Sequence, residues 1–257
     1  MYTDDGDVSQ KYAAGNLGSG GNFDFSQATW GREVGVNANL YGNLHAGLVF
    51  GSADSRQRLV DGIGENRMDG STFGAYATWY VPQGFYVDLS GRWMAADIRS
   101  ISSVGTMPSR VHASAASIEA GYEWTAGGIT FVPQVQYTRT KVEAAAMLHG
   151  ERADFEAEGG TFSRARLGVE MNKTFQFGQT RVTPYGSINA IREFDGRSDY
   201  NVAGYYGSTS VKGTSTMAEL GVGVQKGGFG VTASANWTDG GALKGIVGAQ
   251  LNVRFAW

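Results

Sequence analysis

Apolar and polar residues alternate along most of this chain with the period of two that is typical of β-strands. The alternation is clearest in the last twelve residues. One face there carries Val247, Ala249, Leu251, Val253, Phe255 and Trp257, and the other carries Gly248, Gln250, Asn252 and Arg254. The same pattern predicts about eleven strands, over residues 26–40, 44–52, 71–80, 85–96, 113–124, 129–141, 163–172, 180–192, 215–225, 229–237 and 245–257. The sequence therefore predicts an all-β protein.

Short and long connections alternate between these strands. Tight turns are expected at residues 41–43, 81–84, 125–128, 172–179 and 225–228, and long polar loops near 53–70, 97–112, 142–162, 193–213 and 238–244. This alternation is typical of a transmembrane up-and-down antiparallel barrel with one short-turn rim and one long-loop rim. A β-sandwich has no reason to place every long loop at one end.

Aromatic residues on the apolar parity gather near both rims. Near the short turns are Trp79, Phe85, Trp124, Phe131, Phe229 and Trp257; near the long loops are Trp30, Phe50, Phe73, Trp93, Tyr137 and Trp237. Two aromatic belts around an aliphatic band indicate two membrane–water interfaces, whereas aromatics of a soluble core would scatter along the strands. Arg32 is a charge on the apolar parity, which a position near an interface or a β-bulge would explain.

Composition adds limits to this interpretation. The chain has 257 residues with 39 Gly, 4 Pro and no Cys, and its net charge is −3, which predicts no disulfides, no thiolate metal site and no nucleic-acid partner. It contains no apolar run of the roughly 20 residues that a membrane helix needs. The polar N-terminal residues are not a signal peptide, so an export signal is expected to have been removed or to lie outside the sequence.

An even strand number is the rule for bacterial barrels. The glycine-rich residues 15–22 look like a loop that leads back to residues 1–12. We interpret residues 1–12 as the tail of a first strand that is truncated at its N-terminal end. The prediction is then one barrel domain over residues 1–257, with about 12 strands.

Charged residues on the polar parity are expected to line the lumen. They are Glu33, Asp88, Arg92, Glu119, Glu123, Arg164, Arg166, Glu170, Glu219 and Arg254. One hypothesis makes them a solvated wall of cross-strand ion pairs; a sharper one makes Glu119, Glu123, Glu170 and Glu219 include acids that cleave a peptide in the pore. The three histidines show no metal-ligand spacing. We therefore predict no catalytic site, no cofactor and no bound metal.

Several segments in order carry a family resemblance: FVPQVQYTRTKVE (131–143), RLGVEM (166–171), VTPYGSINAIREFDG (182–196), AELGVGVQ (218–225), FGVTASANWTDGG (229–241) and the terminal strand. Together they resemble the C-terminal translocator domain of bacterial autotransporters, the type V secretion proteins. The resemblance implies a 12-stranded outer-membrane barrel that follows a passenger and a pore-threading helix. It also implies an assembly signal, read by the barrel-assembly machinery, at Gly248, Leu251, Val253, Phe255 and Trp257. Trp257 stands where the family usually ends in Phe.

The resemblance thus predicts a non-enzymatic translocator in the outer membrane of a Gram-negative bacterium, which anchors and supports export of an N-terminal passenger. Its expected partners are outer-membrane lipid and lipopolysaccharide, the barrel-assembly machinery, and its own passenger and linking helix. A monomer is expected. The alternative hypothesis is a stand-alone outer-membrane channel or surface enzyme on a similar barrel. The coding sequence upstream of Met1 would separate the two.

Overall fold

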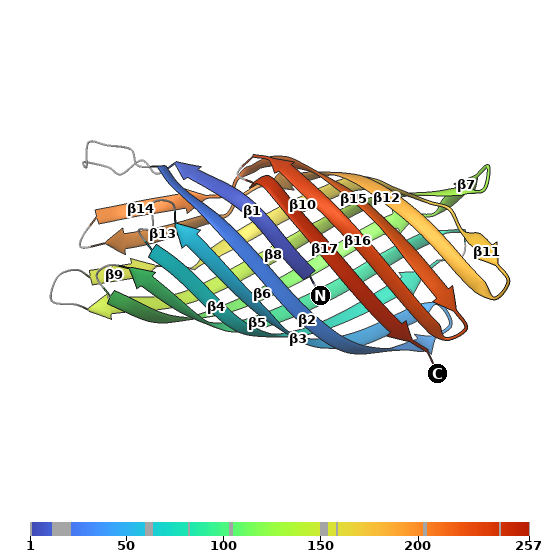
Figure 1. The fold of residues 1–257 in the computed structure, drawn as a ribbon, viewed down its shortest axis with the longest axis horizontal. Helices are drawn as coiled ribbons and strands as arrows, with labels where there is room; N and C mark the ends of the chain where they lie inside the picture. The colour runs from blue at the N-terminus through green and yellow to red at the C-terminus, as the bar shows by residue number, and fades with distance from the viewer. Residues whose placement is uncertain are drawn as a thin grey trace.

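The computed structural model describes residues 2–11, 22–59, 64–81, 83–102, 105–149, 154–157, 159–202, 205–241 and 243–256. These residues form one long antiparallel β-barrel whose strands are strongly tilted against its long axis (Figure 1). Among them, no helix is long and apolar enough to cross a membrane.

Twelve main strands, counted over the described residues, form the wall. They are β1 (Tyr2–Lys11), β2 (Asn22–Tyr41), β3 (Leu44–Leu59), β4 (Gly64–Tyr80), β5 (Phe85–Ser102), β6 (Gly105–Tyr122), β8 (Ile129–His149), β10 (Gly160–Asn172), β12 (Thr180–Glu193), β15 (Gly213–Lys226), β16 (Phe229–Gly240) and β17 (Leu243–Phe255). Each pairs antiparallel with the next along the chain. The ring closes because β1 also pairs with β17.

Five short strands lie at the two ends of the barrel. At the short-turn end, β7 (Trp124–Ala126) pairs with β8 and β11 (Phe175–Phe177) pairs with β12. At the other end, β9 (Asp154–Ala157), β13 (Arg197–Val202) and β14 (Tyr205–Ser210) form a small sheet with the tip of β8. The two ends are therefore unlike, as the alternation of short and long connections predicted (Figure 1).

The structure confirms the predicted barrel of about 12 strands but corrects the long loops. Much of residues 53–70, 97–112, 142–162, 193–213 and 238–244 is strand: β3 and β4, for example, remain paired to Arg58 and Glu65. The hairpins continue because backbone hydrogen bonding between antiparallel strands does not require an apolar face. Beyond the membrane both faces of a strand are wet, so no period-two signal marks it in the sequence.

Apolar side chains point out of this barrel rather than into it. Val34 and Leu220 are each 73% exposed, and the buried apolar side chains among the described residues are Ala96, Val111, Val132 and Ile191 alone. A soluble fold would bury the first group. An apolar band facing outward on every strand is instead the surface expected against lipid.

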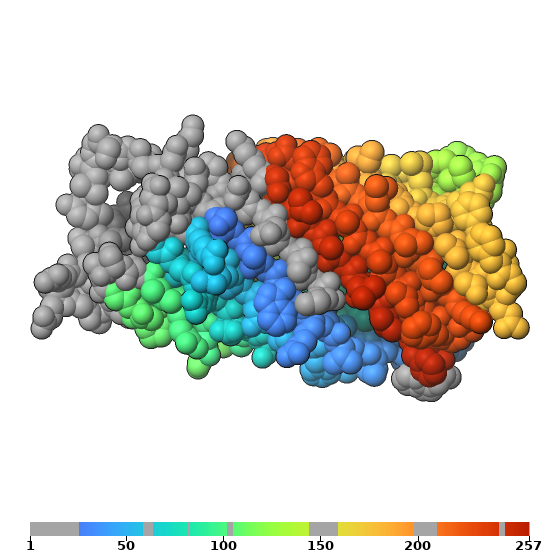
Figure 2. Space-filling view, in the orientation of Figure 1, coloured from blue at the N-terminus to red at the C-terminus, as the bar shows by residue number. Residues whose placement is uncertain are grey.

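Most of the predicted belt aromatics lie on this outer surface. Near the long-loop rim, Phe50 and Phe73 have ring centroids 5.0 Å apart, and Phe73 stacks on Trp93 at 5.6 Å. Trp124 contacts Phe131 at the opposite rim at 5.6 Å. Trp257 lies outside the described residues. In Figure 2, strands from the blue N-terminal part and the red C-terminal part of the chain lie on the same face of this wall.

Arg32 does point outward, and no bulge explains it. The β2–β3 register is continuous from Phe25 to Asn39, so Arg32 keeps the apolar parity. Its Nε donates to Ser52 Oγ at 3.3 Å. Arg32 lies two residues from Trp30, a belt aromatic, which leaves the interface position as its explanation.

Candidate functional site

The inner face of the barrel carries most of the charged residues that the sequence placed on its polar parity. One in-register row crosses β5, β6, β8 and β10 and contains Asp88, Glu119, Gln136 and Arg166. The residues before and after each of them, such as Leu89, are on the outward parity. The barrel thus brings together side chains from four separate strands.

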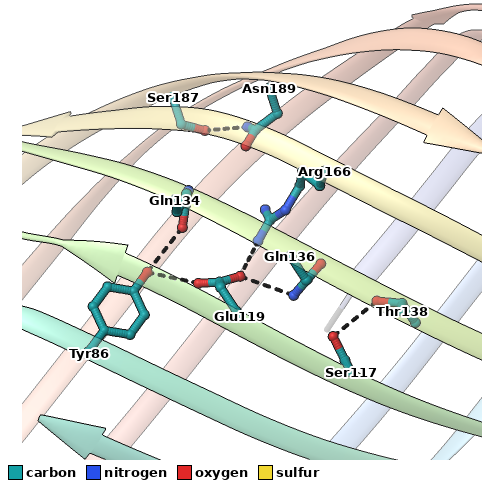
Figure 3. Close-up of polar contacts among 9 residues, drawn as sticks. All are labelled: Tyr86, Ser117, Glu119, Gln134, Gln136, Thr138, Arg166, Ser187 and Asn189. Carbon is teal, nitrogen blue, oxygen red and sulfur yellow. Dashed lines mark hydrogen bonds and ion pairs between the residues drawn. The ribbon is translucent and has the colours of Figure 1, made fainter.

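Glu119 is the centre of a hydrogen-bond network on this wall (Figure 3). It accepts hydrogen bonds from Tyr86 Oη at 2.8 Å, from Gln136 Nε2 at 3.0 Å and from Arg166 Nη2 at 2.5 Å. Tyr86 also contacts Gln134 Oε1 at 3.3 Å. Both oxygens of the carboxylate are therefore occupied, and the Glu119–Arg166 ion pair is mostly shielded, with side chains 14% and 22% exposed. Such shielded, charge-assisted bonds hold neighbouring strands in register.

Three tyrosines that the sequence pattern did not single out lie flat against the inner wall. Each stands directly across the ladder from a glycine, in the pairs Tyr76–Gly47, Tyr86–Gly121 and Tyr185–Gly221. A Cβ atom at any of these glycines would lie 2.4–2.5 Å from the tyrosine ring. The ring can lie on the backbone only because the glycine has no side chain, a pairing that protects strand glycines.

A further ion pair also lies along the wall over glycines. Glu33 on β2 and Arg92 on β5 reach over the two intervening strands, with Arg92 Nη2 3.2 Å from Glu33 Oε2 and Nη1 also bonded to Oε1. The side chains pass over Gly51 and Gly74: a Cβ at Gly51 would lie 2.7 Å from Glu33 Cγ. Large inward side chains thus lie along the wall and leave the lumen open.

The other predicted lumen charges have local partners or lie at the rim. Asp88 accepts from Thr78 at 2.6 Å, Glu170 from Asn172 at 3.1 Å, Glu219 from Tyr185 at 3.0 Å, and Arg164 bonds to the buried Glu193. Glu123 lies between β6 and β7, exposed at the short-turn rim. Arg254 lies on β17, exposed, near Arg181 and Asn252. The structure therefore distributes these charges around the wall rather than gathering them in one site.

Strand geometry fixes the width of the lumen. Twelve strands spaced ~4.8 Å apart and tilted by ~40° enclose a backbone cylinder about 24 Å in diameter. Side chains that lie flat occupy several ångströms on each side and leave a path of roughly 10–12 Å. An α-helix with its side chains is about that wide, so the lumen has room for one helix or one extended chain.

The terminal strand β17 pairs with β16 on one side and β1 on the other. Leu251, Val253 and Phe255 point outward and are 51–65% exposed. Gly248 is on the inner face opposite Asn236, whose side chain would lie 2.9 Å from a Cβ at this glycine. The predicted assembly residues of β17 thus include one apolar outer row and one glycine on which an inner side chain rests.

These features define the general class of this protein, which is an integral outer-membrane β-barrel with an apolar outer surface and a polar lumen. The chain belongs to the autotransporter beta-domain family, whose model matches residues 9–238. The resemblance seen in the sequence is therefore confirmed at the level of the family.

Curated relatives agree with this assignment. The chain is 29% identical over 246 residues to the pertactin autotransporter of Bordetella bronchiseptica, covering 91% of this chain and 26% of the relative. It is 27% identical over 225 residues to the autotransporter adhesin/invasin TibA of Escherichia coli, covering 82% and 22%. The chain spans about a quarter of the length of these relatives.

Solved structures share the fold. The β domain of the Bordetella autotransporter BrkA matches with a TM-score of 0.74 at 18% identity, covering 100% of this chain and 98% of that one. The transport unit of AIDA-I from Escherichia coli matches with a TM-score of 0.71 at 14% identity, covering 100% and 89%. The translocator domain of NalP from Neisseria meningitidis matches with a TM-score of 0.68 at 15% identity, covering 100% and 88%.

Proposed function

We propose that this barrel anchors a passenger segment, encoded upstream of it, in the outer membrane and supports export of that segment through its lumen. The observation that carries the proposal is the open lumen: Tyr76, Tyr86 and Tyr185 lie on glycines instead of filling the interior. The family assignment supports a translocator over a stand-alone channel. The passenger and a helix that links it to the barrel are the expected occupants of the lumen.

Surface display of a reporter tests this proposal. An epitope-tagged reporter fused upstream of residue 1 through a helical linker should become accessible to protease added to intact cells. Inner-face variants that fill the lumen, such as Gly74→Trp with Gly223→Trp, should reduce display while the barrel still inserts. A barrel that inserts normally but leaves the reporter in the periplasm would contradict the proposal.

Conductance gives a second measure of lumen occupancy. In planar bilayers, the chain of residues 1–257 should conduct ions more than a version extended upstream to include a linking helix. The reason is that a helix about 10–12 Å wide fills the estimated path. Equal conductance in the two proteins would show that no upstream helix fills the pore.

We also propose that the barrel-assembly machinery reads β17, through Gly248, Leu251, Val253, Phe255 and Trp257. What supports this is the row of outward apolar side chains on the last strand that closes the ring. Phe255→Asp should lower the amount of heat-modifiable barrel in outer-membrane fractions, whereas Asn252→Asp, on the inner face of the same strand, should not. Equal levels of the two variants would count against recognition of the outer row.

The whole of residues 1–257 is proposed to act as one monomeric barrel domain. Among the described strands, β1 pairs with β2 only as far as Gly31, and the β2 residues from Arg32 to Tyr41 pair with β3 alone. Unpaired backbone groups facing lipid cost several kcal/mol each, so a strand that paired with this edge of β2 would stabilise the barrel. Extending the chain upstream by about ten residues should raise the unfolding temperature.

We propose that the lumen acids are structural and that the chain is not an enzyme. Glu119 receives three hydrogen bonds and Glu219 is bonded by Tyr185, so neither is poised beside an open position. If an acid did cleave the peptide passing through the pore, Glu119→Gln or Glu219→Gln would leave the exported reporter attached to the barrel while the parent released it. We expect no difference in release among the three proteins.

A further inference from the structure

The outer face of β3, β4 and β5 carries two in-register rows of like charges beyond the aromatic ladder formed by Phe50, Phe73 and Trp93. The arginine row is Arg56, Arg67 and Arg99; the aspartate row, one step nearer the membrane, is Asp54, Asp69 and Asp97. Like charges directly opposite each other on neighbouring strands are destabilising. Attraction between the two adjacent rows offsets part of this repulsion, and charged groups outside the chain can offset the rest.

Both rows point away from the lumen. They share the parity of Phe50, Phe73 and Trp93, and no bulge interrupts the β3–β4 or β4–β5 register. Six residues separate Arg67 from Phe73, about 20 Å along the strand, which a tilt of ~40° converts to about 15 Å above the aromatic belt. The arginine row cannot contact cargo in the lumen. It faces the headgroup region around the barrel.

The arginine row and its neighbour Arg58 carry more positive charge than the wall neutralises. Glu65 is the shared partner: Arg56 Nη2 lies 2.6 Å from it, Arg58 Nε 3.7 Å, and Arg67 also bonds to it. Arg99 is exposed and has no carboxylate partner among the described residues. With the aspartate row and with Arg32 and Arg110 on the same outer face counted, six guanidinium groups face four carboxylates. Guanidinium groups match phosphate and carboxylate oxygens in a two-bond geometry.

A groove of about 540 Å³ runs beside the arginine row on the same outer face. Trp30 and Arg32 of β2 line one side, and Arg110 and His112 of β6 line the other. The aspartate row lies along it, with Asp97 held by Arg110 Nε at 2.9 Å. The side chains of five neighbouring strands therefore form a polar recess directly above the aromatic ladder.

We propose that this recess and the arginine row bind the phosphorylated headgroup of lipopolysaccharide. The inference rests on the outer-membrane placement of the barrel and gives its lipid partner a site. Lipopolysaccharide carries anionic groups on its lipid and on the sugars above it. An ordinary phospholipid has one phosphate at the interface, below the height of the arginine row. The charge excess and the height of this surface therefore select lipopolysaccharide.

Binding of a fluorescent lipopolysaccharide to the refolded barrel in detergent, measured in EDTA, tests the proposal. Arg67→Gln with Arg99→Gln should raise Kd about tenfold, from two partly screened charge contacts. Binding of the parent should weaken as salt rises. The control is Arg181→Gln with Arg192→Gln, which removes the same charge from β12, away from the recess, and should leave Kd unchanged.

Removing charge from the aspartate row should change Kd in the opposite direction. Without divalent cations it repels an anionic headgroup, so Asp54→Asn with Asp69→Asn should tighten binding in EDTA. Heat-modifiable migration on gels shows separately that each variant still folds as a barrel. Equal Kd values for the parent and the arginine variant would overturn the proposal. Competition by phosphatidylglycerol as strong as that by unlabelled lipopolysaccharide would overturn the choice of ligand.

Discussion

The substitution Gly121→Ala tests whether flat tyrosines hold the lumen open. The new Cβ would lie 2.4 Å from Tyr86 Cε1, and an ordinary contact begins near 3.4 Å. The ring must therefore lift by about 1 Å into the lumen. Its hydroxyl now donates to Glu119 at 2.8 Å, and that bond is lost or badly strained when the ring moves.

The expected cost follows from this bond. A hydrogen bond to a charged group contributes about 1.5–3 kcal/mol, and replacing glycine by alanine at an unstrained position returns about 0.4–1 kcal/mol through the unfolded state. Gly121→Ala should thus lower the free energy of unfolding by roughly 1–2 kcal/mol. Urea unfolding in detergent, followed by tryptophan fluorescence, measures it.

Two further variants make the reasoning refutable. Gly223→Ala is the matched control, because its Cβ would meet only Thr232 Oγ1 at 3.6 Å and Thr183 O at 3.8 Å; it should be neutral or slightly stabilising. In a Tyr86→Ala background, Gly121→Ala should lose its cost, since no ring remains to displace. Equal costs for Gly121→Ala and Gly223→Ala, or an unchanged cost without the ring, would refute the steric argument.

Three other measurements test separate parts of the structure. Glu119→Gln should lower the free energy of unfolding by about 1–3 kcal/mol, because Arg166 loses its carboxylate; Glu170→Gln, which accepts a hydrogen bond from the neutral Asn172, should cost less, and the same urea titration compares them. Val222→Arg places a charge on the lipid face of β15 and should cost about 2–4 kcal/mol near the bilayer midplane, whereas Thr232→Arg on the inner face of β16 should cost little; reversible unfolding in lipid vesicles separates the two. Hydrogen bonds from Arg56 and Arg67 lower the pKa of Glu65, beyond the membrane band, to about 2. The stabilisation from this pairing is complete above the ordinary carboxyl pKa and is lost as pH falls from there through about 2. Carbon NMR of labelled glutamate should therefore show one carboxyl that titrates far below the others.

The period-two alternation predicted the strands because a membrane barrel sorts residues by face, and β12 and β16 were located within a few residues. The alternation did not predict the outer halves of β3 and β4, because residues there are not sorted into an apolar and a polar face. There both faces are polar, as Arg56, Gln57 and Arg58 show, and the signal vanishes where lipid ends.

A single sequence does not show which residues on neighbouring strands lie opposite each other. Tyr86 and Gly121 are ordinary lumen residues until the β5–β6 register places one on the other. Arg67 and Arg99 likewise become neighbours only through the β4–β5 register. A search for a tyrosine on the polar parity of one strand and a glycine on that of the next would have proposed the first pair. It could not have ranked that pair above other registers.

Glycine content links the sequence to the proposed export function. Inward-facing residues of a barrel this size narrow the lumen if each large side chain stands away from the wall. Here Tyr76, Tyr86, Tyr185 and Asn189 instead lie on in-register glycines, and Glu33 and Arg92 pass over two more. Inner-face glycines thus let large polar side chains bind one another along the wall, which holds the strands together without blocking the lumen. A barrel that must be stable and also transmit a chain needs both properties at once, and alanine at these positions would force a choice between them.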